Sequence, residues 1–197
     1  MSQKRPAEVL PDEQIKALIG ACSTRAPTGI RNRALIAVLW RCGLRISEAL
    51  ALMLSDIDLD NEVLSVRHGK GDRPRKLGID TTTAALLARW IDRRKALGHN
   101  GRNRPVFCTL DGHAIDQSYV RHLLRRLALK AGLERRVHPH GLRHSYAAGL
   151  AREGTPMNVI RDALGHTSLA TTDRYLREVA PMHVIETMRQ REWTLAD

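Results

Sequence analysis

The stretch that decides the fold runs from residue 138 to residue 176 and reads HPHGLRHSYAAGLAREGTPMNVIRDALGHTSLATTDRYL. His140 and Arg143 are three positions apart, so a helix that begins just after Pro139 places both side chains on one side. Both also lie near the helix N-terminus, where backbone N–H groups favour an anion. The stretch therefore predicts a helix whose first turn is suited to a negatively charged group.

A second helix is predicted directly after the first. Thr155 is a residue type typical of an N-cap, Pro156 suits a first helical turn, and Gly165 suits a helix end. His166 then follows in a turn, and Tyr175 lies on a short polar helix. The pattern places one histidine and one tyrosine beyond the end of this second helix.

The three tyrosines of the chain differ in their surroundings. Tyr119 and Tyr146 follow the helical spacing of neighbouring leucines, which predicts that both belong to the core. Tyr175 has an arginine on either side and no such stripe, so it is the candidate for chemistry. Each candidate also has an ordinary alternative, because histidines often cap helices and arginines on a basic protein are often solvated charges.

The composition favours a polyanionic partner. The 197 residues include 32 Lys and Arg against 21 Asp and Glu, a formal charge of +11. A merely basic surface, as in ribosomal proteins, is the alternative. The three cysteines (Cys22, Cys42 and Cys108) are odd in number and widely spaced, which predicts small buried thiols in a reducing compartment. The chain shows neither a signal peptide nor an apolar run long enough for a membrane, so we expect a cytoplasmic protein.

The rest of the chain alternates helical patterns with one hairpin. Residues 1–9 are expected to be a flexible lead-in, and Ser47 is a candidate cap for a short helix after a turn at Gly43 and Leu44. One further helix is expected to begin at Asp12. Other helices are expected to cover about 29–42, 80–97, 116–131 and 181–193. Residues 62–66 and 75–79 alternate like strands of a hairpin. The fold class is therefore α+β, mostly helical, with a small antiparallel hairpin at about 62–79.

These motifs together carry a family resemblance. The run H-x-x-R-H-S, followed by L-G-H-T-S and T-T-x-R-Y, resembles the catalytic core of the tyrosine recombinases, the phage integrase family of site-specific DNA recombinases. Upstream, G-L-R-I-S-E-A-L around Arg45 and G-K-G-D-R-P-R from Gly69 to Arg75 resemble two further motifs of the family. Gly78 stands where the family usually has proline. The resemblance covers about residues 10–190.

The resemblance implies a set of site residues. The catalytic set would be Arg45, Lys70, His140, Arg143, His166 and Tyr175, with Glu48 orienting the site. The two arginines and His166 would stabilise charge on a phosphodiester, and His140 would accept the proton of the nucleophile Tyr175. Lys70 would protonate the leaving 5′ oxygen. The implied reaction is DNA strand cleavage and rejoining through a 3′-phosphotyrosine, which requires no cofactor.

Further DNA contacts are predicted at four basic residues, namely Arg73, Arg75, Arg121 and Arg125. The arginines of the 116–131 helix are either ordinary solvated surface charges or a surface that contacts successive phosphates of the DNA backbone. A metal site at His138, His140 and His144 is not expected, because no cysteine or carboxylate partner at the usual spacing accompanies them. The guanidiniums would instead supply the positive charge.

The expected domain organisation is a catalytic domain over residues 10–180 and a C-terminal helix or tail over residues 181–197. In the family this tail packs on a neighbouring protomer, so we expect a homo-tetramer on double-stranded DNA, with a monomer allowed in isolation. The chain is either a catalytic domain from a larger integrase, which we favour, or a single-domain recombinase. Two alternative functions are a type IB topoisomerase or telomere-resolvase-like enzyme, and a non-catalytic DNA-binding module.

Overall fold

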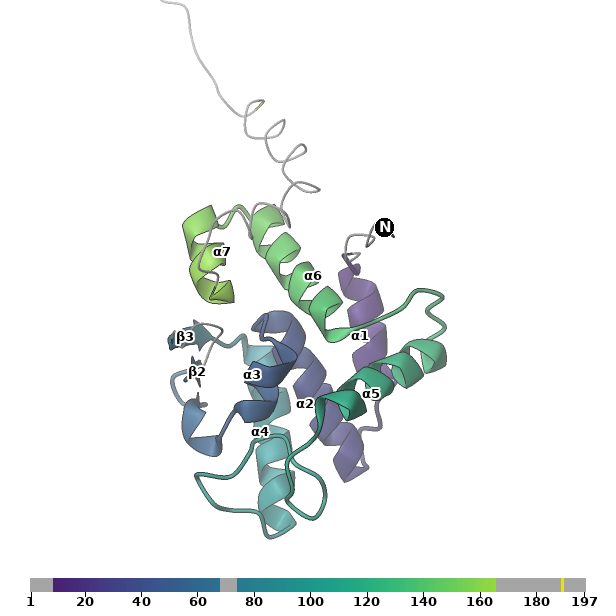
Figure 1. Cartoon of the computed structure of the whole chain (residues 1–197), viewed down its shortest axis with the longest axis vertical. Helices are drawn as coiled ribbons and strands as arrows, with labels where there is room; N and C mark the ends of the chain where they lie inside the picture. The colour runs from purple at the N-terminus through teal and green to yellow at the C-terminus, as the bar shows by residue number, and fades with distance from the viewer. Residues whose placement is uncertain (1–8, 68–73, 166–188, 190–197) are drawn as a thin grey trace, which may run out of the picture.

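The computed structural model describes residues 9–67, 74–165 and 189. Its helices are α1 (Asp12–Gly20), α2 (Pro27–Arg41), α3 (Ile46–Ala51), α4 (Thr81–Ala96), α5 (Gln117–Lys130), α6 (Pro139–Arg152) and α7 (Met157–Leu164). Three short strands, β1 (Ile57–Asp58), β2 (Val63–Val66) and β3 (Arg75–Gly78), form one antiparallel sheet after a 3-10 turn, η1 (Leu54–Asp56). Figure 1 shows the helices as the bulk of the molecule and the sheet at one edge. The predicted α+β class is confirmed.

Helix α2 is the centre of the fold. It contacts α1, α3, α4 and α6, and its residues are buried on nearly every side (Figure 1). The sequence predicted a start near Gly29, whereas the helix begins at Pro27. Proline suits this first position because its missing N–H would have no helical partner there.

The predicted hairpin is confirmed by the pairing of β2 with β3. Leu64 lies opposite Leu77, and Val66 lies opposite Arg75. Leu64, Val66 and Leu77 are buried, as the alternation along both strands requires. Strand β1 was not predicted, because two residues are too few to show an alternating pattern. The hairpin tip at residues 68–73 lies outside the described residues.

Helix caps were predicted with mixed success. Asp80 caps α4 at the start of the predicted 80–97 helix, since its carboxylate accepts the Thr83 N–H at 3.0 Å. The Ser47 prediction was wrong, because α3 begins at Ile46 with Arg45 as its N-cap. There the carboxylate of Glu48 accepts the Arg45 N–H, which is the contact that the acidic residue of a capping box makes.

The predicted cap at Thr155 was also wrong, because this residue belongs to the end of α6. Its N–H donates to the Leu150 carbonyl, and the Gly154 N–H donates to the Ala151 carbonyl. Gly154 has φ of +76°, so these residues form the glycine-dependent Schellman ending of α6. Helix α7 starts at Met157 with Pro156 as its N-cap, and Gly165 ends it with φ of +61°, as predicted.

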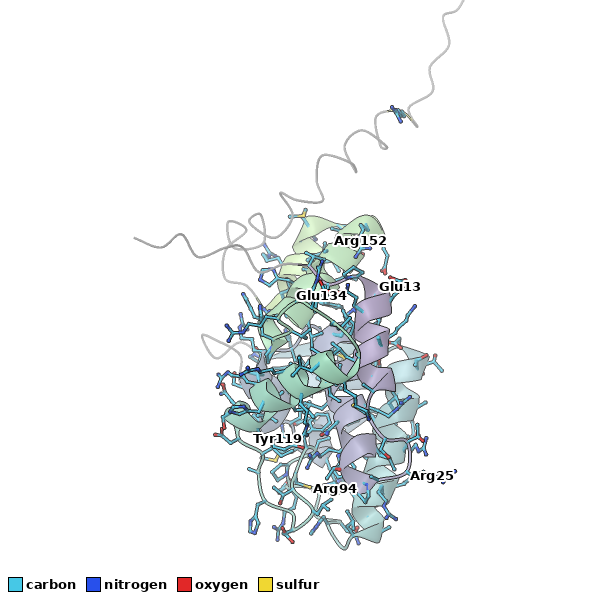
Figure 2. All side chains as sticks on the ribbon, turned by 90° about the vertical axis from the view of Figure 1, so that its right-hand side faces the viewer. Glu13, Arg25, Arg94, Tyr119, Glu134 and Arg152 are labelled. Atoms are coloured by element: carbon cyan, nitrogen blue, oxygen red, sulfur yellow. The ribbon has the colours of Figure 1, made fainter. Side chains whose placement is uncertain are left out.

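The core confirms the predictions for the cysteines and two tyrosines. Cys22, Cys42 and Cys108 are buried free thiols. Tyr119 packs against the main core, and Tyr146 packs against a smaller cluster between α6 and α7. Figure 2 turns α1 and α5 toward the reader and labels Tyr119 near the start of α5.

Two further predictions concern the C-terminal helix and membrane-spanning segments. The predicted helix at 181–193 lies outside the described residues, apart from Arg189. Every helix over residues 9–67 and 74–165 is too short or too polar to cross a membrane.

Candidate active site

The site is built around the buried carboxylate of Glu48. This side chain is 1% exposed and projects from the first turn of α3. Its Oε2 atom accepts the Arg45 N–H at 2.9 Å. The contact that starts α3 therefore also fixes the position of this carboxylate.

Three guanidiniums surround this carboxylate. Arg45 Nη1 lies 2.7 Å from Oε1, and Arg75 donates to both oxygens at 3.2 and 2.8 Å. Arg143 Nη1 lies 3.7 Å from Oε2. Burial opposes ionisation of Glu48, but the hydrogen bonds from Arg75 and Arg45 outweigh it and hold the pKa of Glu48 below its usual range. Three cations around one anion leave the site with an excess of positive charge.

Arg143 is fixed by backbone carbonyls from two other parts of the chain. It lies in the first turn of α6, and its side chain is 5% exposed. Nη1 donates to the Gly43 carbonyl at 2.7 Å, and Nη2 donates to the Leu164 carbonyl at 2.5 Å. Gly43 has φ of +58°, and a Cβ there would lie 2.2 Å from the Tyr146 ring. The turn at Gly43 is therefore a glycine position because it must pass close to α6.

His140 lies at the start of the same helix. Its ring makes an edge-on contact with His144 at 4.3 Å between ring centroids. His140 is exposed at the surface, yet this packing removes water from part of the ring, and that desolvation lowers the pKa of His140 below its ordinary value. The charges of His138, Arg143 and Arg45 lower the pKa further. The imidazole is therefore poised to be neutral at neutral pH and able to accept a proton.

His138, and not His140, is the histidine that caps helix α6. Its Nδ1 atom accepts the Gly141 N–H at 3.0 Å, which makes it the N-cap of α6. His138 and His140 are stacked at 6.5 Å between ring centroids. Within the described residues, no three histidine, cysteine or acidic side chains gather as a metal site would require.

The structure brings together five of the predicted site residues, Arg45, Glu48, Arg75, His140 and Arg143. Arg121 and Arg125 are exposed on α5. Four other predicted residues lie outside the described residues, namely Lys70, Arg73, His166 and Tyr175. Three of these adjoin the cluster in sequence, since Lys70 and Arg73 precede Arg75 and His166 follows Gly165.

The role of Arg75 in this cluster was missed. The sequence placed it among DNA contacts, but its side chain is 9% exposed and bound to protein atoms. The strand alternation contained the signal, because Arg75 is two residues from the buried Leu77 and so shares its inward face.

A substitution at Gly165 tests how closely α7 approaches this cluster. We expect Gly165→Ala to destabilise the fold by about 1–2 kcal/mol, because φ of +61° is unfavourable for a residue with a Cβ. The added Cβ would also lie 2.9 Å from Arg75 Nη1. Gly154→Ala is the matched control, since Gly154 also has a positive φ of +76° and a Cβ there meets nothing within 4 Å. Chemical denaturation of both variants measures the difference, and equal stability would contradict the close approach.

The fold and the cluster define an α+β domain with an arginine-rich site for an anionic group. Residues 8–180 match the model of the phage integrase family. The chain therefore belongs to the phage integrase family.

Similar proteins include bacterial recombinases. The chain is 35% identical over 175 residues to the tyrosine recombinase XerC of Alcanivorax borkumensis, covering 88% of this chain and 57% of the relative. It is 33% identical to the tyrosine recombinase XerD of Lacticaseibacillus casei, covering 88% of this chain and 59% of the relative. The chain thus spans less than two thirds of the length of these relatives.

Solved structures share the fold. The crystal structure of XerA recombinase matches with a TM-score of 0.80 and 28% identity, over 98% of this chain and 68% of that one. The structure of the XerH site-specific recombinase in a post-cleavage complex with its difH substrate matches with a TM-score of 0.77 and 27% identity. That match covers 96% of this chain and 55% of the XerH chain.

Proposed function

We propose that the protein is a site-specific DNA recombinase that cleaves and rejoins DNA strands through a 3′-phosphotyrosine. The observation that carries the proposal is the arrangement of Arg45 and Arg143 around Glu48, with His140 beside them. A phosphodiester under attack gathers negative charge on its non-bridging oxygens, and fixed guanidiniums stabilise that charge without moving. Membership of the phage integrase family supports the same chemistry.

The proposed cleavage step forms one bond and breaks one. The hydroxyl oxygen of Tyr175 attacks the phosphorus, and the bond to the 5′ oxygen breaks. His140 accepts the tyrosine proton, which suits a histidine whose pKa is lowered. Lys70 donates a proton to the departing 5′ oxygen, and His166 adds a hydrogen bond to the phosphate. A 5′-hydroxyl from another strand then reverses the step and joins the exchanged strands.

The partners proposed from the family are double-stranded DNA and further copies of the chain. A homo-tetramer would hold two DNA duplexes, with residues 181–197 packing on a neighbouring protomer. The reaction would take place in the cytoplasm of a bacterium or of a phage-infected host. Residues 10–180 would form the catalytic domain.

Covalent capture tests the proposal. The 197-residue chain would be incubated with a library of nicked duplexes that are randomised around the nick, so that the freed short strand diffuses away after cleavage. We expect complexes that survive denaturing detergent, joined to a DNA 3′ end, and formed equally well in EDTA because Arg45 and Arg143 supply the positive charge. Absence of an adduct would refute strand cleavage, and relaxation of supercoils without sequence preference would indicate a topoisomerase.

The charge of the protein predicts salt-sensitive DNA binding. If the +11 chain neutralises about six phosphates, log K should fall against log salt with a slope near −5. Arg121 and Arg125 are exposed on α5, so Arg121→Ala and Arg125→Ala should each make the slope shallower by about 0.9 if they contact phosphates. Fluorescence anisotropy over a range of salt concentrations measures the slope. A slope near zero would rule out the electrostatic account.

A further inference from the structure

Three guanidiniums converge on the C-terminal end of α7. Arg75 Nε donates to the Ala163 carbonyl at 2.9 Å, and Arg143 Nη2 donates to the Leu164 carbonyl at 2.5 Å. Arg45 Nη2 lies 3.5 Å from the Gly165 carbonyl. Carbonyls at the end of a helix have no helical partner and attract cations, so this end of α7 is held by the same arginines that surround Glu48.

Arg75 differs from the other two arginines in its surroundings. Its Nη atoms form a fork on the two oxygens of Glu48, while its Nε atom reaches α7. Its side chain is 9% exposed, between the 5% of Arg143 and the 25% of Arg45, so the fork on Glu48 is what sets Arg75 apart. The donors of Arg75 thus point at protein atoms, and a planar fork of this kind fixes the orientation of the carboxylate.

Helix α7 depends on these polar contacts because its apolar attachment is small. Only Ile160 and Leu164 of α7 are buried, and with Ala147 they form a cluster separate from the main core. The helix contacts α6 and β3. A short helix with so little buried surface needs a second attachment to hold its position, and Arg75 on β3 provides one.

We propose that Arg75 is a positioning residue for DNA cleavage, and that it acts through Glu48 and the end of α7 instead of contacting DNA. Through Glu48 it orients Arg45, and through the Ala163 carbonyl it fixes the chain that leads into His166. It stands on β3, the strand that follows the segment containing Lys70. The inference rests on the proposed function, since positioning matters only if these groups act on a phosphate.

The test compares Arg75→Ala and Arg75→Lys with Lys76→Ala, whose side chain is exposed on the same strand. Single-turnover adduct formation should fall about 100-fold in Arg75→Ala, a loss typical of a misplaced catalytic group. Arg75→Lys should recover only part of the rate, because an ammonium cannot form the fork on Glu48. Lys76→Ala should cleave at the native rate.

The salt dependence of DNA binding distinguishes a positioning residue from a residue that contacts a phosphate. Loss of a positioning residue should leave the salt dependence of binding unchanged, whereas loss of a phosphate contact should make its slope shallower by about 0.9. A shallower slope in Arg75→Ala, or a native cleavage rate, would overturn the inference.

Hydrogen exchange keeps the inference testable without cleavage. The amides of residues 157–165 should exchange faster in Arg75→Ala than in the native chain and in Lys76→Ala, while exchange in α2 stays the same. If α2 also exchanges faster, Arg75→Lys, which keeps the charge, replaces the alanine variant. Unchanged exchange in α7 would overturn the inference whether or not the native chain cleaves DNA. Failure of the native chain to form an adduct would instead overturn the proposed function.

Discussion

Replacement of Tyr175 by phenylalanine is expected to abolish the covalent protein–DNA adduct while DNA binding remains. The substitution keeps the aromatic ring and removes only the hydroxyl, which is the atom that would attack the phosphorus. Without the nucleophile, the other members of the site have no bond to form. The measurement is detergent-resistant adduct formation on the nicked substrate, with binding measured in parallel by anisotropy.

The structure distinguishes the two tyrosines that serve as controls. Tyr146→Phe is the better match, because its ring packs between α6 and α7 and its hydroxyl is not needed for the proposed reaction. We expect it to form the adduct. The hydroxyl of Tyr119 is hydrogen-bonded to the buried Arg31, so Tyr119→Phe should cost about 1–3 kcal/mol of stability and still cleave once folded. An adduct retained in Tyr175→Phe would show that another residue is the nucleophile.

Local signals in the sequence were enough to predict most of the elements. Asp80 caps α4, and the alternation within 62–66 and within 75–79 predicted the two strands of the hairpin. These features depend on residues a few positions apart, where the backbone period decides which side chains share a face. The same reasoning placed His140 and Arg143 together in the first turn of α6.

The contacts that build the site could not be predicted in this way. Glu48 meets Arg75 from β3 and Arg143 from α6, and the carbonyls at the end of α7 complete the cluster. Such pairings depend on how elements pack, and charged residues far apart in sequence give no periodic signal. The family motifs marked Glu48 as a site residue but did not indicate which arginines it would bind.

Glu48 is expected to make the site sensitive to acid pH. Hydrogen bonds from Arg75 and Arg45 hold its pKa below the ordinary value, so it contributes stability above the unfolded-state pKa of a glutamate. That contribution is lost as the pH falls through the lowered folded-state pKa. A neutral Glu48 would leave the three guanidiniums without their anion.

The second large effect is expected for Lys70→Ala. An alkoxide is a poor leaving group, and a positioned general acid typically contributes about 10²–10⁴ in rate. We therefore expect the variant to cleave ordinary DNA more slowly by a factor in that range. Single-turnover adduct formation on the nicked substrate measures the rate.

A sulfur substitution identifies what Lys70 does. Replacing the bridging 5′ oxygen of the scissile phosphate by sulfur gives a leaving group that departs without a proton, so the Lys70→Ala variant should recover most of its rate on that substrate. Tyr175→Phe should not recover, since it lacks the nucleophile, and Lys76→Ala, exposed on β3, should behave like the native chain on both substrates. If Lys70→Ala stays equally slow on the sulfur substrate, Lys70 is not the general acid, and Arg73 becomes the residue to test.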